Sequence, residues 1–433
     1  MCAKGDRWHT TRASAARVSE RRTWRLAVIV AVLIAVAGIS TSVQASTVAD
    51  PSAGAAQTGP APQLTGLAAS VLTRPSAVRG SDGRLHIAYE LVLTGSTPFA
   101  VDVEQFEVRD ARTHRVLLSL AGDALSSRMN PVGGAPAGVT PPPTTQIGPS
   151  GSAVIWLDVL VRRNARLPGV LEHRIVSSTR PPPGERSARF TSLVGRVPLR
   201  SRPPLKLGPP VGSGIWGAGE GCWDNETHHR RGLLVVDGNQ VVPQRFAIDW
   251  MRLDQQHRAW VGDPARLSSY LSYGQPLIAA AGGRVVEALD RFSDQVPPDN
   301  PTPPTFVDLP GNHVTLRVGR GIYLIYAHMK PGSVRVRVGE RVRRGQVLGK
   351  LGNSGNSATP HLHLQAQTTR SFASDGLPFV FRGFRFLGQI TSPDLSDEIL
   401  GLRSNGQLPF APASGSGTRR DQMPLDRSVV RFP

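Results

Sequence analysis

The stretch Thr359-Pro360-His361-Leu362-His363-Leu364 places two histidines two residues apart between apolar residues. On a β-strand, side chains i and i+2 project from the same face, about 6.5–7 Å apart. One imidazole can therefore bind a metal ion while the other reaches an open coordination position beside that ion. Two surface histidines on an exposed strand face are the alternative interpretation of this short pattern.

A long, ordered series of motifs leads up to this stretch. It contains Tyr326-Ala327-His328, Gly332-Ser333-Val334, Gly345-Gln346-Val347-Leu348-Gly349 and Gly352-Asn353-Ser354-Gly355-Asn356-Ser357. Together with Tyr273–Gly283 and Gly311–Val314, this series resembles the catalytic half of the lysostaphin-like, or LytM-type, zinc metallopeptidases. Enzymes of that family cut peptide cross-links in bacterial peptidoglycan, and the resemblance covers about residues 225–388.

The resemblance implies a role for each matching residue. His363 becomes a zinc ligand, and His361 becomes the general base that takes a proton from the attacking water. His328 becomes the second histidine of the catalytic pair, and Asp249 becomes the carboxylate ligand. The implied cofactor is Zn²⁺, which catalytic sites hold with three protein ligands and one open position.

One ligand of the family pattern is missing. Its His-x-x-x-Asp element reads Arg245-Phe246-Ala247-Ile248-Asp249 here, and a guanidinium that never deprotonates cannot bind zinc. We expect His229 to supply the missing ligand, with His228 as the alternative. The remaining interpretation is that both histidines cap a loop.

A hairpin signal supports this expectation. Asp237-Gly238-Asn239 lies between the apolar runs Gly232–Val236 and Gln240–Val242, and such a sequence favours a two-residue turn. A Gly238-Asn239 turn would place His229 opposite residue 248, and an Asp237-Gly238 turn would place it opposite residue 246. Both registers bring His229 close to Asp249, and strand alternation would turn His228 to the opposite face.

Two residues are candidates for contact with substrate. Asn312 is expected to line the groove of the site. Arg245 lies four residues before Asp249 on the same predicted face, so we expect its cation near the site, where it would receive an acidic group of the substrate. His257 and His313 receive no role beyond structure or surface.

The whole chain is expected to be mainly β. Leu85, Ile87, Tyr89, Leu91 and Leu93 alternate with polar residues, which predicts a half-buried strand, and similar segments follow at 101–108, 114–119, 152–161, 170–177 and 189–199. We expect an N-terminal antiparallel β-sandwich-like domain and a C-terminal antiparallel β-sheet peptidase domain. The predicted ranges are a flexible linker over 46–75, the sandwich over 76–199, a Pro-rich linker over 200–210, the LytM-type domain over 211–388, and a tail over 389–433 with a docking strand near its end.

The N-terminus predicts export. Arg21 and Arg22 precede the apolar run Leu26–Ile39, which is too short for a membrane span and fits a secretory signal peptide over residues 1–45. The expected location is therefore secreted or in the cell envelope, with membrane contact only through the signal segment. Cys2 lies before the cleavage site, so Cys222 would remain alone and neither a disulfide nor a four-cysteine zinc site is available.

The charge suggests which partners to expect. Lys and Arg number 50 against 32 Asp and Glu, for a formal net charge of +18. Most of these cations are arginines, which a GC-rich coding sequence produces without selection, whereas attraction to a polyanion is the functional interpretation. No nucleic-acid-binding motif is present, so we expect peptidoglycan peptide stems and anionic envelope polymers, and no nucleic acid.

The predicted function is an exported zinc metalloendopeptidase that hydrolyses peptide cross-links of bacterial peptidoglycan. The alternative is a catalytically inactive LytM-type domain that binds the cell wall or activates another wall hydrolase. Asp249, His328, His361 and His363 favour catalysis, and Arg245 favours the alternative.

Overall fold

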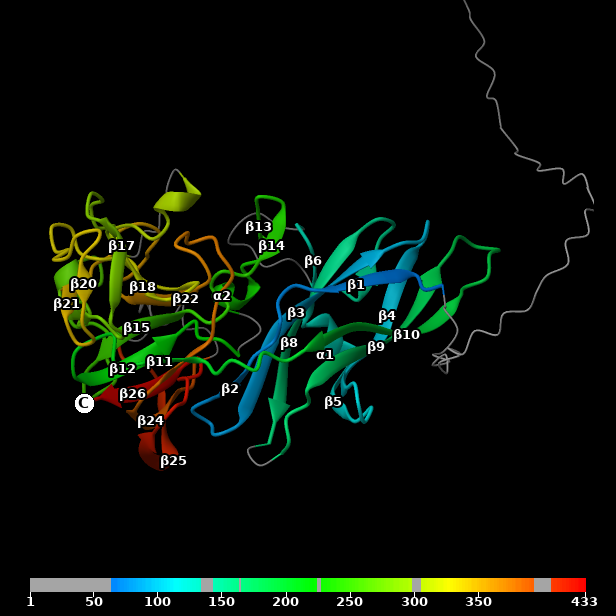
Figure 1. Ribbon diagram of the computed structural model, residues 1–433, viewed down its shortest axis with the longest axis horizontal. Helices are drawn as coiled ribbons and strands as arrows, with labels where there is room; N and C mark the ends of the chain where they lie inside the picture. The colour runs from blue at the N-terminus through cyan, green and yellow to red at the C-terminus, as the bar shows by residue number, and fades with distance from the viewer. Residues whose placement is uncertain (1–63, 134–142, 163–164, 224–226, 298–304, 393–405) are drawn as a thin grey trace, which may run out of the picture. The chain divides into compact units, whose positions relative to one another are not determined.

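The computed structural model describes residues 64–433, apart from 134–142, 163–164, 224–226, 298–304 and 393–405. Within the chain, Gln63–Pro433 forms one compact unit, shown in Figure 1. The predicted signal peptide and the first part of the predicted linker, up to residue 63, lie outside the described residues. Among the described residues, no helix combines the length and apolar character that a membrane crossing requires.

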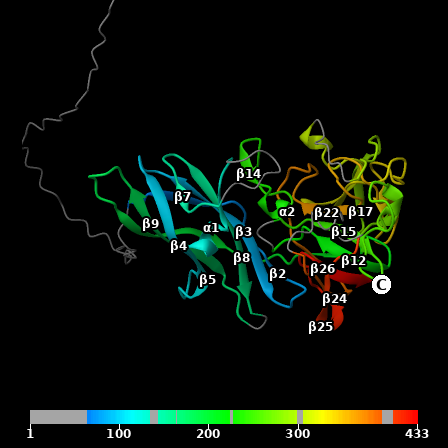
Figure 2. The ribbon, with the colours of Figure 1, turned by 180° about the vertical axis from the view of Figure 1, so that it is seen from behind.

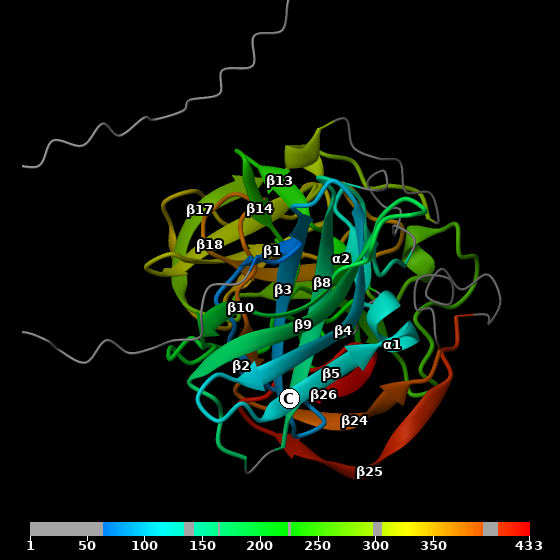
Figure 3. The same cartoon turned by 90° about the vertical axis from the view of Figure 1, so that its right-hand side faces the viewer.

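The first group of strands forms two antiparallel sheets that enclose a common apolar core. Figure 3 shows them, with β3 and β8 in one sheet and β4 and β9 in the other. The first sheet contains β1 (Leu67–Val71), β3 (Leu85–Gly95), β8 (Ser152–Val161) and β6 (Met129–Pro131), with β2 (Ala77–Arg79) paired to β3. The second contains β10 (Arg189–Pro198), β9 (Val170–Arg180), β4 (Ala100–Asp110) and β5 (Val116–Ala121), with β7 (Gln146–Ile147) paired to β4.

Strand β3 is buried on both faces. Its apolar residues, such as Tyr89 and Leu91, enter the core between the two sheets as their alternation predicted. The opposite face, predicted to be solvent-exposed, is buried as well: Glu90 has 0% exposure, and Ala88 belongs to the core of the second group of strands. The prediction of a half-buried strand is therefore wrong, because residues far along the chain cover the polar face.

The second group is built on a ten-stranded sheet whose paired strands are antiparallel. Its central strands carry the candidate site, and Ile248 and Trp250 anchor them in the core. In spatial order the sheet contains β20 (Arg341–Val342), β17 (Gly283–Leu289), β18 (His313–Gly319), β19 (Ile322–Tyr326), β22 (Leu362–Gln367), β15 (Ile248–Leu253), β12 (Gly214–Gly219), β26 (Ser428–Phe432), β24 (Phe384–Ile390) and β25 (Phe410–Arg419).

Short elements complete the described structure. Three strand pairs flank the large sheet: β11 (Leu205–Leu207) with β23 (Phe379–Phe381), β13 (Leu234–Val236) with β14 (Asn239–Val241), and β16 (Pro276–Ile278) with β21 (Val347–Lys350). The helical segments are single turns: α1 (Asp123–Ser126), α2 (His228–Arg231), η1 (Leu267–Ser269) and η2 (Phe306–Asp308). The mainly β fold predicted from the sequence, with its antiparallel sheets, is confirmed.

Three predicted connecting segments contain strands. β1 lies in the predicted flexible linker, and β11 lies in the predicted Pro-rich linker, with Leu207 in the core. Their short alternating apolar residues were obscured by the surrounding Ala, Pro and Ser. The predicted tail contains β25 in addition to the docking strand near the C-terminus, which is β26. Because β26 pairs with both β12 and β24, the sheet extends beyond the predicted domain end at 388.

The integration of β26 gives a stability prediction. Phe432 is 1% exposed, and its ring lies 5.2 Å from that of Trp250 and 5.4 Å from that of Phe381. Phe432→Ala should lower the free energy of unfolding by about 3–5 kcal/mol, because it leaves a cavity in a packed core. Urea denaturation measures this change, with Val338→Ala as the exposed control. A change as small as that of the control would show that the C-terminal strand is not part of the core.

Candidate metal centre

Asp249 and His363 lie directly opposite each other in the middle of the ten-stranded sheet. The register of β15 and β22 pairs the two residues, and His363 Nδ1 lies 2.9 Å from Asp249 Oδ1. β15 also pairs with β12, and β22 also pairs with β19. Because each strand has a partner on both sides, ladders of hydrogen bonds fix the backbone of both residues.

His229 reaches Asp249 from the short helix α2. The Oγ1 of Thr227 caps this helix by accepting a hydrogen bond from the Arg230 amide at 3.3 Å. His229 Nε2 lies 3.5 Å from Asp249 Oδ2, and the rings of His229 and His363 are 4.8 Å apart. Figures 1 and 2 show α2 beside β22 accordingly. The structure thus brings His229 to Asp249, as the sequence predicted.

The route to this position differs from the predicted one. The hairpin β13–β14 pairs Leu234 with Val241 and Val236 with Asn239, so its turn is Asp237-Gly238, one of the two registers considered. Strand pairing ends at Leu234, and residues 228–231 are helical. His229 therefore approaches Asp249 from a helical turn and not from a continuing strand, and strand alternation does not separate it from His228.

His228 is a rim residue of the site. Its side chain is 62% exposed, and its Nδ1 lies 3.0 Å from Glu220 Oε2. Burial alone would lower the pKa of His228, but the interaction with this carboxylate outweighs it and raises that pKa. Potential ligand atoms of His228, His229 and Asp249 lie within 4.8 Å of one another, so these three could also hold a metal ion. We favour His363 over His228 because His363 is buried and touches Asp249, whereas His228 is paired with Glu220.

His361 and His328 complete the cluster. His361 directly precedes β22, and its Nε2 lies 3.5 Å from Asp249 Oδ2. Its side chain retains 13% exposure, more than His229 or His363, which are nearly inaccessible. The His328 ring lies 4.7 Å from that of His361 and 5.9 Å from that of His363. The four predicted imidazoles therefore gather around one carboxylate.

Backbone carbonyls fix the proton on three of these rings. A carbonyl oxygen can only accept, so each contacting Nδ1 must carry the hydrogen and leave a lone pair on Nε2. The bonds are His229 Nδ1 to Glu220 O at 3.0 Å, His361 Nδ1 to Thr359 O at 2.7 Å and His328 Nδ1 to Ser354 O at 2.8 Å. Two such Nε2 atoms face Asp249, an arrangement that a cation between them would stabilise.

Unlike His229 and His361, whose Nε2 atoms face Asp249, His363 faces this carboxylate through Nδ1. Its Nε2 lies 3.1 Å from Gln365 Oε1, while Nδ1 faces Asp249. Gln365 Nε2 in turn donates to Gln367 Oε1 at 2.6 Å, which orients the Gln365 oxygen toward the ring. With its proton on Nε2, His363 would offer the Nδ1 lone pair to a metal ion. Gln365 thus serves as the orienting partner that metal-binding histidines usually have.

The electrostatics favour the forms that bind metal. Burial lowers the pKa of His229 and His328 well below the usual value, and for His328 the neighbouring His361 adds to this effect. Burial alone would raise the pKa of Asp249, but His361, His229 and His363 outweigh it and hold that pKa well below the usual range. A neutral His229 beside an ionised Asp249 is the combination of protonation states that zinc requires of these two residues.

The donor set fits zinc in type, and one of its ligand pairs also fits in spacing, whereas His363 Nδ1 and Asp249 Oδ1 are 2.9 Å apart, a hydrogen-bond distance. Zinc binds His nitrogen and carboxylate oxygen at about 2.0–2.2 Å, which places neighbouring ligand atoms of a tetrahedral site roughly 3.3–3.6 Å apart. The 3.5 Å between His229 Nε2 and Asp249 Oδ2 matches this spacing. His229, Asp249 and His363 would hold the ion, and His361 and His328 would lie beside its open position.

A close backbone approach orients His328 and His361. A Cβ atom on Gly355 would lie 2.4 Å from the Gly311 amide nitrogen, and both glycines have positive φ. Only glycine fits such a contact without displacing backbone. The loop around Gly355 presents the Ser354 carbonyl to His328, and its Ser357 hydroxyl lies 3.3 Å from His361 Nδ1.

The prediction that Asn312 lines a substrate groove is contradicted. Its side chain is fully buried. Its Oδ1 accepts from the amides of Arg291 and Phe292 at 2.7 and 2.8 Å, and its Nδ2 donates to the Phe292 and Met329 carbonyls. With its hydrogen-bonding capacity used internally, Asn312 joins two loops behind His328 and has nothing to offer a substrate.

The predicted role of Arg245 as a receiver of acidic substrate groups is contradicted as well. Its side chain is 0% exposed. Its Nε and Nη2 donate to the Glu90 carboxylate, and its Nη1 donates to Asp375 Oδ1 at 2.8 Å. The cation is neutralised inside the protein. Four-residue spacing from Asp249 did not place the two side chains in one site, because the chain turns between residues 243 and 246 and β15 begins only at Ile248.

Several residues that orient the side chains of the site were not predicted from the sequence. The carbonyls of Glu220, Ser354 and Thr359 carry no side-chain signal that could have identified them. Gln365 could have been found, since it follows His363 by two residues on the same strand face. The partner of Arg245, Glu90, is 155 residues away in the chain, and no local pattern connects the two.

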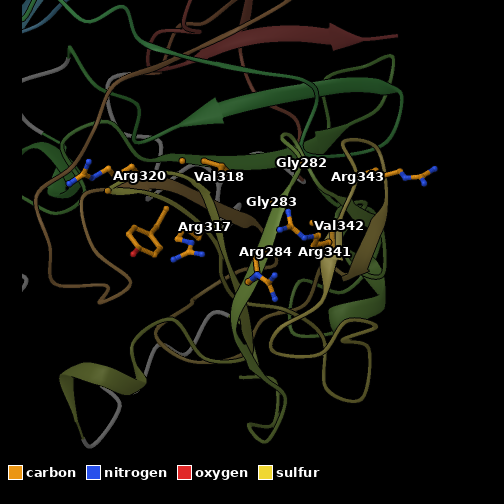
Figure 4. A pocket seen from close by; sticks show the side chains of 12 residues that line it. Gly282, Gly283, Arg284, Arg317, Val318, Arg320, Arg341, Val342 and Arg343 are labelled. Carbon is orange, nitrogen blue, oxygen red and sulfur yellow. The ribbon is translucent and has the colours of Figure 1, made fainter.

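A large cavity of about 970 Å³ lies away from the histidine cluster and is shown in Figure 4. Its lining includes Arg284, Arg317 and Arg341 and none of the site residues described above. Strand β18 begins at His313, next to Asn312 and His328. Arg317 lies near the other end of this strand. The cavity is therefore a second feature of the sheet and not the groove of the metal centre.

Comparison with known proteins agrees with the predicted family. Residues 268–374 match the model of peptidase family M23. Over 115 residues the chain is 29% identical to the glycyl-glycine endopeptidase ALE-1 of Staphylococcus capitis, an alignment that covers 26% of this chain and 27% of that protein. Lysostaphin of Staphylococcus simulans is also 29% identical over 115 residues, covering 26% of this chain and 20% of its own length. The predicted resemblance to lysostaphin-like peptidases is confirmed.

Solved structures give more distant matches. The catalytic domain of lysostaphin from Staphylococcus simulans matches at 22% identity and a TM-score of 0.21, covering 38% of this chain and 86% of that chain. The catalytic domain of the M23 protein EnpA from Enterococcus faecalis, in a mutant form, matches at 20% identity and a TM-score of 0.21, covering 30% of this chain and 73% of that chain. Scores this low add nothing to the assignment of individual residues.

The metal centre predicts a pattern of zinc affinities. His229→Ala should weaken zinc binding about as much as Asp249→Ala, because each removes one of three ligands, and His228→Ala should change it little. Competition with a chelating dye measures these affinities on the purified chain. A large loss in His228→Ala together with parent affinity in His363→Ala would exchange the two residues as third ligand.

Proposed function

Because residues 268–374 carry a match to peptidase family M23, we propose that this protein is a zinc metalloendopeptidase that hydrolyses peptide cross-links of bacterial peptidoglycan. The observation that carries this proposal is the arrangement of His229, His361 and His363 around the Asp249 carboxylate. His229, Asp249 and His363 are the proposed zinc ligands. Bound zinc would polarise the scissile carbonyl and lower the pKa of a coordinated water toward neutrality.

His361 is the proposed general base. Its Nδ1 proton is held by the Thr359 carbonyl, so Nε2 is free to take a proton from the attacking water. The same nitrogen can then deliver that proton to the leaving amine of the cut peptide bond. The residual exposure of His361 fits this task, because the base must reach a substrate that enters from solvent.

His328 is the proposed partner of His361. The Ser354 carbonyl holds its Nδ1 proton, and the low pKa of this ring keeps it neutral. Its Nε2 can therefore accept a hydrogen bond from the attacking water or the leaving amine, but not donate one. We assign it to orienting the reacting groups, while His361 transfers the proton.

The substrate and the location belong to the same proposal. The curated relatives are a glycyl-glycine endopeptidase and lysostaphin, and the alignments cover only 27% and 20% of their lengths. A peptide stem of peptidoglycan is the substrate class that we infer from this likeness. Export through the predicted signal peptide at residues 1–45 would bring the enzyme to that substrate.

The competing proposal, a LytM-type domain that binds or activates without cutting, rested on Arg245. The contacts of Arg245 with Glu90 and Asp375 give this residue a structural role, and His229 lies beside Asp249 in place of the missing ligand. The presence of Arg245 therefore no longer favours an inactive domain.

The function is tested with purified cross-linked peptidoglycan and the His361→Ala and His363→Ala variants. His361→Ala should retain zinc and lower kcat by about 10²–10⁴-fold, since it removes only the general base. His363→Ala should lose zinc together with activity. Release of new amino groups from the peptidoglycan measures cleavage. A parent protein that binds zinc and releases no amino groups would contradict the enzyme proposal and support the non-cutting form.

A further inference from the structure

The metal ligand His229 sits on an element that no sheet supports. Asp249 and His363 lie in strands paired on both sides, whereas α2 is one turn of four residues. A single turn has few internal hydrogen bonds and is marginal on its own. The position of His229 must therefore depend on contacts that α2 makes with its surroundings.

The strongest of these contacts runs from α2 to the first group of strands. Arg230, the residue after His229, is 0% exposed and donates through Nη1 to Glu90 Oε1 in β3. Its Nη2 donates to the carbonyls of Tyr89 and Leu157 at 2.9 and 3.0 Å, and its Cζ lies 5.4 Å from the Trp156 ring. A planar guanidinium held by several acceptors cannot shift without breaking them together.

The next residue provides a second anchor. Arg231 Nη1 donates to Asn130 Oδ1 at 2.8 Å, and its Nη2 donates to the Ser127 carbonyl at 2.7 Å. Two consecutive side chains of α2 are thus fixed on β3, on Leu157 and on residues 127–130, while His229 contacts Asp249.

We propose that Glu90, acting through Arg230, is a positioning residue for the zinc ligand His229, so that the β-sandwich is an integral part of the metal centre. This inference rests on the proposed zinc site. It assigns the sandwich a task in assembling that site, separate from any contact it makes with the cell wall.

The test compares Arg230→Met with Arg245→Met. Each variant removes one of the two buried guanidiniums that share Glu90, but only Arg230 belongs to α2. Arg230→Met should weaken zinc binding by about 10–100-fold, the usual effect of losing an orienting contact behind a ligand. Arg245→Met should keep an affinity close to that of the parent. Dye competition gives the affinity, and the visible spectrum of the Co²⁺-loaded full chain reports the ligand geometry.

Arg231→Met keeps the test decisive if Arg230→Met does not fold, because Arg231 is only partly buried. It should also weaken zinc binding and alter the Co²⁺ spectrum, and Arg230→Lys should restore part of the affinity. Folded Arg230→Met or Arg231→Met with parent affinity and spectrum would overturn the positioning role. A parent chain that binds no zinc would overturn the proposed function itself.

An independent observation concerns the cavity of Figure 4. Arg284 of β17 is the register partner of Arg341 in β20 on one side and of Arg317 in β18 on the other. Three arginines thus form a row across adjacent strands, and like charges directly opposite each other destabilise a sheet. Figure 4 shows Arg284 and Arg341 close together and Arg343 pointing away.

This row of arginines has no carboxylate counter-ion in the described part of the chain. In the described part of the chain, none of the three forms an ion pair, and the cavity lining contains no acidic residue. Some other arginines of the described chain are paired with carboxylates, namely Arg180 with Asp102, Arg189 with Glu104 and Arg258 with Asp254.

We infer that the cavity binds a phosphodiester-linked polymer of the cell envelope. Guanidinium groups bind phosphate oxygens in a bidentate way, and a row of three would relieve its own repulsion by binding successive phosphates. A volume of about 970 Å³ exceeds what a single phosphate needs. The site would hold the enzyme at the wall while the metal centre works elsewhere on the sheet.

The probe is a glycerol-phosphate oligomer, titrated calorimetrically against the full chain. The triple variant Arg284→Gln, Arg317→Gln, Arg341→Gln should weaken binding by roughly tenfold or more and reduce its salt dependence. The control is Arg180→Gln, Arg189→Gln, Arg258→Gln, which removes the same charge and should change binding little. Equal losses of affinity in both variants would show that the oligomer is bound by general charge attraction and not by the cavity. Equal binding of polyglutamate would overturn the phosphate preference.

Discussion

The arrangement of the candidate site depends on the pairing of the buried Glu90 carboxylate with Arg230 and Arg245. Burial alone would raise the pKa of this group, but Arg245 and Arg230 hold it below its usual range. A buried charge is tolerated only when it is paired and hydrogen-bonded, so both guanidiniums must stay in place. Arg230 adjoins His229, and Arg245 precedes Asp249 by four residues. The pairing with Arg230 thus fixes the chain next to the candidate ligand His229, whereas Asp249 is held by the strands on either side of β15.

Features encoded by neighbouring residues were predictable from the sequence. The period-two alternation in Leu85–Leu93 indicated β3, and the His361-Leu362-His363 spacing indicated two imidazoles on one face of a strand. Asp249 was predicted only through the family resemblance, and the register of β15 and β22 places it opposite His363. The exposure of the polar face of β3 was mispredicted, since Glu90 in an alternating strand looks like any solvent-facing residue.

Features that depend on distant partners could not be predicted. Arg245 was placed near substrate from its spacing to Asp249. Spacing within one segment carries no information about its actual partner Glu90, which lies 155 residues earlier in the chain. Asn312 was expected to line the groove, yet its amide joins two loops through hydrogen bonds that depend on the fold. His229 was found for an incomplete reason: the hairpin register was considered, but the helical turn that carries the ring was not.

Arg245, which stands where the family pattern has a histidine, and the upstream His229 are therefore linked through the same contacts. A histidine at 245 could not serve Glu90 as Arg245 does, because an imidazole cannot donate to both carboxylate oxygens and to Asp375 together. Once residue 245 is used to bury Glu90, the third ligand must come from elsewhere. The same carboxylate also binds Arg230, and this contact holds His229 where that ligand is needed. The presence of arginine at residue 245 and the proposed ligand role of His229 are thus both linked to the burial of Glu90 in the interior.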